Sequence, residues 1–458
     1  MNPLIFREYD IRGLYETDLT TDTVRLIGKA VGTELLRRGA TDMVVGTDVR
    51  TSSPRLKRDL LDGLTSTGIA VYDVGQVPTP ALYFSILHMN AGGGVQITGS
   101  HNPREFNGFK MCHGLASLYG EQIQHLLKMI EAEDFETGES TVKQVDILDE
   151  YEADVLSRVK LDRPLKVVID AGNGCASEIA PRIFEKLGCE VIPLYCEIDG
   201  NFPNHLPDPT VLKYVKDLMA KVKETGADIG IGYDGDADRI GAIDNKGRMV
   251  PGDRLLGLFA ADMLTRNPGE SIVFDVKCSQ ALPEFIESKG GNPVMWKTGH
   301  SLIKTKMKET HAPLAGEMSG HIFFSENYHG FDDAIYGSCL LAKIIARDGS
   351  LADLADEIPR YVSTAELRVK ATDEGKFRIV DELVAYFRKD HDVIDIDGVR
   401  VLFGDGWGLV RASNTQPVLV MRFEARSEDR LAEIAETVLS KVREYPSVEL
   451  GDISLEAI

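Results

Sequence analysis

The sequence predicts three related α/β domains with mostly parallel, mixed sheets and a C-terminal α+β domain with an antiparallel sheet, arranged around a central cleft. Three observations support this fold class. A chain of 458 residues is too long for one core and suits three or four domains. One order of elements, in which the first strand ends at an aspartate and the third ends in a polar loop, occurs three times. Beyond about Ala365 this order gives way to short strands and a hairpin signal.

The first repeat leads to a serine. Its first apolar strand ends at Asp48, and its third strand breaks into the polar run Gly99, Ser100 and His101. A hydroxyl is therefore expected at a strand end. The elements expected in this repeat are helices over 21–38 and 55–68 and strands over 43–47, 70–74 and 94–98.

The second and third repeats put an acidic loop and a glycine-flanked loop at the same point. Their first strands end at Asp170 and Asp275. Ligands in open α/β sheets bind at the carboxyl ends of the strands, so we expect the three loops to face one cleft. The expected elements are strands over 166–169, 190–194, 228–232, 272–274 and 293–296, a strand from Leu314, and a helix over 177–186.

The C-terminal unit follows a different plan. An Asp397-Gly398 pair between apolar runs is a good hairpin signal. The expected elements are strands over 366–370, 399–403, 408–412 and 418–425 and helices over 375–388 and 427–443. We expect the four domains to span residues 1–145, 146–249, 250–362 and 363–458.

Composition excludes several classes of function. A formal charge of -21 argues against a nucleic-acid partner, because such binding rests on many basic residues that neutralise phosphates. The six cysteines have no C-x-x-C spacing, so neither a zinc site nor a disulfide framework is indicated. The first ten residues contain Arg7, Glu8 and Asp10, and no run reaches membrane-spanning length. We expect a cytoplasmic protein with a small-molecule ligand, no membrane partner and an oligomeric state that the sequence does not define.

The setting of Ser100 favours a nucleophile over an ordinary turn residue. Gly99 allows a tight turn, His101 and Asn102 can donate hydrogen bonds to an oxyanion, and Lys110 lies shortly downstream. A serine that accepts a phosphoryl group also needs a nearby cation.

The run Asp234-Gly235-Asp236-Ala237-Asp238 offers a place for that cation. It is not an EF-hand, because the sixth and twelfth positions are Arg239 and Asn245. In an extended segment alternate residues point to one side, so Asp234, Asp236 and Asp238 are expected to converge on one hard cation, most plausibly Mg²⁺.

Two further loops suit a phosphorylated sugar. Glu317, Ser319 and His321 alternate in a glycine-flanked turn, and a carboxylate there can accept from two sugar hydroxyls. The run 411–415 combines an arginine with hydroxyl and amide groups, which fits an anion. Each pattern by itself also fits an ordinary turn, as does the single His300.

Together the four motifs TGSHNP, DGDADR, GEMSGH and RASNT, in this order along the chain, resemble those of the α-D-phosphohexomutases. The third loop, with Lys297-Thr298-Gly299-His300 and Gly406-Trp407-Gly408, is similar to that of the bacterial phosphomannomutase/phosphoglucomutase group. Phosphoglucosamine mutases typically carry glutamine at the position of Met318.

The resemblance implies reversible phosphoryl transfer between C1 and C6 of glucose and mannose phosphates, through a phosphoserine and a hexose 1,6-bisphosphate that is both intermediate and activator. Ser100 would be the phosphoserine and, with Asp234, Asp236 and Asp238, would hold Mg²⁺. Substrate would be bound by Lys277, Lys297, Glu317, Ser319, His321, Arg411, Ser413, Asn414 and Thr415. Catalysis would also use Arg12, Lys110, Arg239, His300 and His321. A phosphoglucosamine mutase, a phosphatase and a noncatalytic sugar-phosphate sensor remain alternatives.

Overall fold

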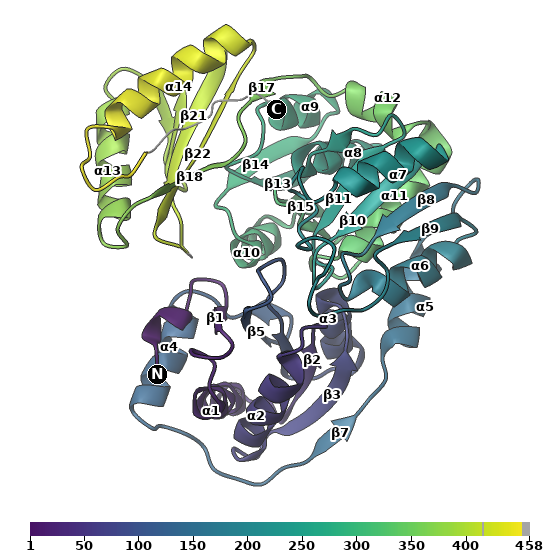
Figure 1. Ribbon diagram of the computed structural model, residues 1–458, viewed down its shortest axis with the longest axis vertical. Coiled ribbons are helices and arrows are strands. Elements are labelled where there is room, and N and C mark those ends of the chain that lie inside the picture. Colours follow the sequence, from purple (N-terminus) through teal and green to yellow (C-terminus); the bar gives the residue numbers. More distant parts are fainter. Residues whose placement is uncertain (415, 451–458) are drawn as a thin grey trace.

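The computed structural model describes residues 1–414 and 416–450. It contains four separate sheets, each belonging to one domain, numbered I to IV in chain order. The domains follow one another around an arc, with domain I (purple) and domain IV (yellow) at its two ends (Figure 1). The predicted fold class is confirmed.

Domain I is built on a sheet in the order β1-β5-β4-β2-β3-β7, with β6 paired to β5. The central strands β4, β2 and β3 are parallel, and β5 returns antiparallel beside β4. The strands are β1 (Ile11–Leu14), β2 (Asp42–Thr47), β3 (Ala70–Gln76), β4 (Gly93–Ile97), β5 (Phe106–His113), β6 (Ala116–Ser117) and β7 (Val142–Gln144). The helices are the 3-10 helix η1 (Pro3–Ile5), α1 (Thr21–Arg37), α2 (Ser53–Thr65), α3 (Thr79–His88) and α4 (Glu121–Glu131).

Helix α3 is absent from the sequence-based expectation. It is buried from Thr79 to Ile86, so it lacks the polar face that marks an amphipathic helix. Its apolar side chains join a core cluster that continues into domains II and III, whereas α1, α2 and α4 pack on a separate cluster. Domain I is therefore fastened to its neighbours through α3.

Domains II and III repeat one plan, in which three parallel strands are followed by an antiparallel return strand. In domain II the order is β12-β11-β10-β8-β9, and in domain III it is β14-β13-β15-β16. The strands are β8 (Lys166–Asp170), β9 (Glu190–Leu194), β10 (Ile229–Tyr233), β11 (Ile240–Asp244), β12 (Met249–Val250), β13 (Ser271–Asp275), β14 (Asn292–Trp296), β15 (Leu314–Gly316) and β16 (Ile322–Phe324). The helices are α5 (Leu148–Arg158), α6 (Ala176–Lys186), α7 (Lys216–Thr225), α8 (Gly252–Leu264), α9 (Ala281–Ser288), α10 (His300–Thr310), α11 (Ala334–Asp348) and α12 (Leu351–Asp356). Helix α11 packs on β10 and β11, which ties domain III to domain II.

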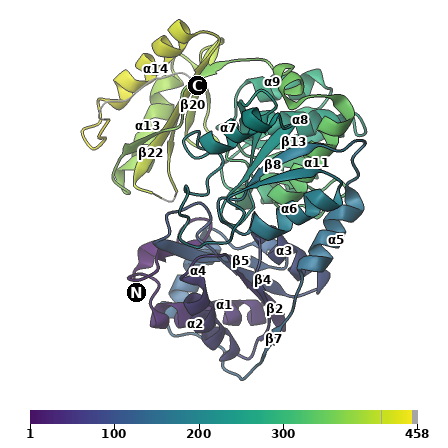
Figure 2. The same cartoon turned by 45° about the vertical axis from the view of Figure 1, so that its right-hand side comes forward.

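Domain IV is an antiparallel sheet in the order β17-β22-β21-β20-β19, with β18 also paired to β22. Two helices pack on its strands and share one core cluster with them, and Figure 2 shows this domain from a second side. Its elements are β17 (Val362–Ser363), β18 (Leu367–Lys370), α13 (Gly375–Phe387), β19 (Asp392–Ile394), β20 (Val399–Leu402), β21 (Gly406–Ala412), β22 (Val418–Ala425) and α14 (Glu428–Val442). Among the described helices of the whole chain, none is long and apolar enough to cross a membrane.

Candidate functional site

The loops that follow β4, β10 and β15 touch one another. The Ser100 hydroxyl donates to Asp234 Oδ2 at 2.7 Å, which joins the loops of domains I and II. A Cβ atom added to Gly235 would lie 2.4 Å from the Ser100 carbonyl oxygen, so only glycine allows this approach. The Ile240 amide donates to the Gly320 carbonyl at 3.1 Å, which joins the loops of domains II and III. The structure therefore brings together the three loops that follow the third strand of each repeat, as the sequence predicted.

Ser100 is held in a tight local conformation. Its φ of 48° lies in the left-handed region, which a non-glycine residue adopts only at a cost. Its amide donates to Thr98 Oγ1 at 2.8 Å, and its hydroxyl lies 3.1 Å from His101 Nδ1. Burial lowers the pKa of His101 well below its ordinary value, so this ring is neutral at pH 7. The side chain of Asn102 donates to the Gly99 carbonyl and supports the loop itself.

The three aspartates converge through a turn, and the expectation of an extended segment is wrong. The Ala237 amide donates to the Asp234 carbonyl at 3.1 Å, and Ala237 has φ 59°. This turn folds Asp234, Asp236 and Asp238 back on one another, with their ligand atoms within 4.8 Å. A left-handed alanine has no signal in the sequence, which explains the error.

The donor set of this loop fits a divalent cation. All three carboxylates are buried, and within the described part of the chain the Oδ1 atoms of Asp236 and Asp238 have no hydrogen-bond partner. Burial and the neighbouring carboxylates raise the pKa of Asp234 well above its ordinary value. Buried carboxylate oxygens left without donors are suited to a hard metal ion.

Lys110 neutralises part of this charge. Its ammonium group donates to Asp236 Oδ2 at 2.7 Å and also to Asp238. Burial alone would lower the pKa of Lys110, but these carboxylates more than offset it and raise the pKa above its usual value. Lys110 is therefore a permanent cation beside the serine. Thr79, at the start of α3, adds a hydrogen bond of 2.6 Å to Asp236 Oδ2.

Glu317, Ser319 and His321 lie on the domain III loop that joins β15 to β16. The Gly320 amide donates to the Glu317 carbonyl at 3.0 Å, so this segment forms the turn that its flanking glycines predicted. Glu317 accepts from the Gly299 amide and lies 3.3 Å from the Ser319 hydroxyl. Burial raises the pKa of Glu317. A buried carboxylate beside a hydroxyl is suited to bind neighbouring sugar hydroxyls.

His321 is fixed by groups from two domains. Its Nε2 accepts from Arg239 Nε at 2.9 Å, which leaves the proton on Nδ1, 2.9 Å from Asp332 Oδ2. The His300 ring stacks on it, with centroids 5.5 Å apart, and burial holds the pKa of His300 well below its ordinary value. Asp332, which directly precedes the N-cap residue of α11, has no motif around it and was missed from the sequence.

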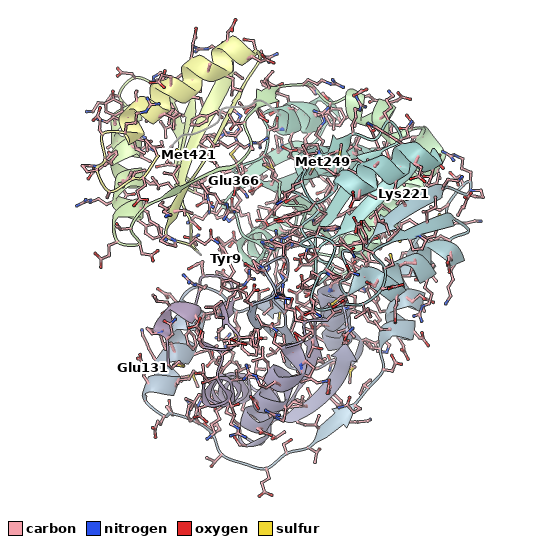
Figure 3. The ribbon with its side chains drawn as sticks, in the orientation of Figure 1. Tyr9, Glu131, Lys221, Met249, Glu366 and Met421 are labelled. Carbon is pink, nitrogen blue, oxygen red and sulfur yellow. The ribbon has the colours of Figure 1, made fainter. Side chains whose placement is uncertain are left out.

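The anion motif of domain IV lies against domains I and III. Arg411 forms an ion pair of 3.0 Å with Asp397, and the Thr298 amide donates to the same carboxylate at 2.9 Å. Asn414 donates to the Tyr9 hydroxyl at 2.9 Å, and that hydroxyl donates to the Thr298 carbonyl at 2.8 Å. Figure 3 places Tyr9 between domain I and the two domains above it. Tyr9 was missed, although it lies in the same polar run as Arg12.

The remaining predicted residues lie around this centre. Lys277 forms an ion pair of 3.2 Å with Glu366 and thereby lowers the pKa of Glu366 to about 2. Arg12 pairs with Asp10, and Lys297 is exposed. Ser413 is buried and its hydroxyl accepts from the Gln416 amide, whereas Thr415 lies outside the described residues.

The chain matches four family models in order. They are described as phosphoglucomutase/phosphomannomutase alpha/beta/alpha domains I, II and III and the C-terminal domain, and they match residues 3–137, 147–247, 251–361 and 366–441. A phosphomannomutase/phosphoglucomutase of Pseudomonas putida is 50% identical over 453 residues, 97% of each chain. A phosphoglucomutase of Neisseria meningitidis is 44% identical over 97% of this chain and 98% of its own. A solved family member from Burkholderia thailandensis superposes with a TM-score of 0.93 at 44% identity, over 98% of this chain and 99% of its own. The chain therefore belongs to the phosphoglucomutase/phosphomannomutase family.

Proposed function

We propose that the protein moves a phosphoryl group between the C1 and C6 hydroxyls of glucose and mannose phosphates, by way of phospho-Ser100 and a hexose 1,6-bisphosphate. The observation that carries this proposal is the direct hydrogen bond of 2.7 Å between the Ser100 hydroxyl and a buried carboxylate cluster. The names of the similar proteins, which include phosphomannomutase/phosphoglucomutase and phosphoglucomutase, support the same substrate class.

Asp234, Asp236 and Asp238 would hold Mg²⁺ together with an oxygen on Ser100. Their oxygen-only donor set is the kind that Mg²⁺ prefers. A bound Mg²⁺ would reduce the negative charge that develops on the transferred group.

In the first transfer, a hydroxyl oxygen of the sugar forms a bond to phosphorus while the bond from phosphorus to Ser100 Oγ breaks. The electron pair of the broken bond stays on Oγ, and the hydroxyl proton passes to a base. Lys110 cannot be this base, since its raised pKa keeps it protonated; it stabilises the charge in transfer. His300 is suited to accept the proton, because it is neutral and its Nδ1 has no partner among the described residues.

The bisphosphate then turns end for end, and its other phosphate returns to Ser100. One pocket must therefore read the sugar in two orientations while it holds whichever phosphate is not reacting. Glu317 and Ser319 would bind hydroxyls of the ring, and Lys277 and Arg411 would bind the distant phosphate. In this proposal the protein is cytoplasmic, and the ligands of the site are small phosphosugars.

The test is to label the enzyme with glucose 1,6-bisphosphate carrying ³²P. Ser100→Ala should abolish stable labelling while thermal unfolding stays close to that of the wild type, because the change removes one hydroxyl. Ser117→Ala, which removes a half-buried serine hydroxyl on β6, is the matched control and should label normally. Stoichiometric labelling of the Ser100→Ala protein would contradict the assignment.

A further inference from the structure

We propose that Arg50 is a positioning residue, which holds the phosphoserine loop in the shape needed for phosphoryl transfer. This inference rests on the proposed function of Ser100. Arg50 follows β2 and is 1% exposed. No sequence motif singled it out.

One guanidinium group binds the whole loop. Its Nη2 donates to the carbonyl oxygens of Ser100 at 2.8 Å and Asn102 at 2.6 Å, and its Nη1 donates to those of Pro103 at 2.8 Å and Phe106 at 3.0 Å. Every carbonyl in this set belongs to the segment between β4 and the start of β5. A planar fork with several donors can serve four acceptors at once, and an ammonium group cannot.

A carboxylate completes the support from the same side. Asp48, the aspartate that ends β2, accepts from Arg50 Nε at 3.0 Å and from the Gly99 amide at 3.0 Å. A Cβ atom added to Gly99 would lie 2.5 Å from the guanidinium carbon. Gly99 is therefore required so that the arginine can lie against the loop. Asp48 holds the Gly99 amide before Ser100, and Arg50 holds the Ser100 carbonyl after it.

The same group also joins the loop to domain II. The ring of Phe202, in the segment between β9 and α7, lies 5.1 Å from the guanidinium carbon in a cation-π contact. A Cβ atom added to Gly200 would lie 2.3 Å from the Val49 carbonyl oxygen and 2.9 Å from the Arg50 Cα, so this segment packs closely against the backbone at Arg50. Arg50 therefore sets where Ser100 lies relative to the carboxylates of domain II.

The consequence for the reaction is geometric. Ser100 has a left-handed φ of 48°, a conformation that needs support from its surroundings. Phosphoryl transfer requires Oγ and the attacking oxygen to lie in line, and an error of about 1 Å can cost about a hundredfold in rate.

The experiment compares Arg50→Lys with Arg55→Lys. Arg55 is a matched control, because its Nη2 also binds two carbonyl oxygens in domain I, those of Tyr15 at 2.6 Å and Leu19 at 2.9 Å, but none in the serine loop. For each protein we would measure kcat, KM, Tm and the inorganic phosphate released per sugar phosphate converted. Arg50→Lys should lower kcat about tenfold to a hundredfold, change KM by less than about twofold, and raise the fraction of phosphate lost to water. Arg55→Lys should leave kcat, KM and the inorganic phosphate released per sugar phosphate converted unchanged.

An Arg50→Lys protein with wild-type kcat would overturn the proposal, as would an equal loss in Arg55→Lys. Should Arg50→Lys fail to fold, Phe202→Leu is the deciding variant, because it removes the cation-π contact and keeps an apolar side chain. Phe202→Leu should lower kcat several-fold at constant KM. An unchanged kcat in Phe202→Leu would overturn the proposal. A wild-type protein that converts no hexose phosphate would instead refute the proposed function, which separates the two failures.

Discussion

Three buried aspartates and one buried lysine lie beside Ser100, and they leave a net negative charge that a metal ion would balance. We therefore expect Mg²⁺ to stabilise the wild-type protein against unfolding, by about 2.7 kcal/mol at a concentration a hundred times the dissociation constant. Asp238→Asn should abolish most of this gain, because it removes one of the three converging carboxylates. Thermal unfolding with EDTA and with Mg²⁺ measures the effect. Asp217→Asn, at an exposed position, is the control, and an undiminished Mg²⁺ effect in Asp238→Asn would place the metal elsewhere.

That Ser100 and the three aspartates lie close together could be predicted from the sequence, whereas their backbone conformations could not. The runs around Ser100 and Asp236 are recognisable because strand ends, glycine and clustered carboxylates are local signals. The turn at Ala237 and the ion pair between Arg411 and Asp397 depend on contacts made only in the folded chain.

At the scale of elements, the strand-end aspartates support their loops in different ways. Asp48 and Asp275 each accept a hydrogen bond from the amide one residue before the central serine of the loop, namely Gly99 and Met318. Asp170 binds His205 instead, at 3.1 Å. The repeat found in the sequence thus corresponds to a shared contact in two domains and to a histidine contact in the third.

This difference predicts a pH dependence of stability. Burial alone would lower the pKa of His205, but its hydrogen bond to Asp170, the charge of Asp170 and a hydrogen bond to the Leu206 carbonyl together more than offset this and raise the pKa above its ordinary value. A histidine whose pKa is raised by folding contributes stability that is fully present below the unfolded pKa and is lost as the pH rises through the folded pKa. The Tm of the wild type should therefore fall between about pH 6 and pH 8 more than that of His205→Gln. Parallel profiles for the two proteins would contradict this.

The parallel strands of the three repeats, and their succession along the chain, were predictable from sequence because buried parallel strands are short apolar runs that end in polar loops. Helix α3 was not, because burial on nearly every side removes the polar face by which a helix is recognised. The antiparallel return strand β11 also lacked a signal of its own, since it follows the aspartate loop without a marked hairpin pair.

At the scale of the whole molecule, contacts between domains complete the site. The Tyr9 hydroxyl of domain I binds Thr298 of domain III and Asn414 of domain IV. Such contacts join residues 289 and 405 positions apart in sequence, which is why Tyr9 was not predictable from local pattern.

The position of domain IV predicts the effect of Arg411→Ala. A charge-assisted hydrogen bond to phosphate contributes about 1.5–3 kcal/mol, so KM should rise about tenfold to a hundredfold. The rise should be similar for the 1-phosphate and the 6-phosphate of glucose, since in the proposed reaction Arg411 would hold whichever phosphate is not reacting. Arg388→Ala, an exposed arginine on the same domain, should leave KM unchanged. Unchanged affinity and turnover in Arg411→Ala would show that domain IV does not bind the phosphate through this residue.

In the proposed reaction, one serine carries phosphate between the two ends of one sugar. The most direct measurement follows glucose 1-phosphate and mannose 1-phosphate side by side by ³¹P NMR, with Mg²⁺ and a trace of glucose 1,6-bisphosphate. We predict that the signal of each sugar moves from the 1-phosphate to the 6-phosphate position with no growth of inorganic phosphate. Conversion of neither sugar, or a signal that accumulates as inorganic phosphate, would contradict the account.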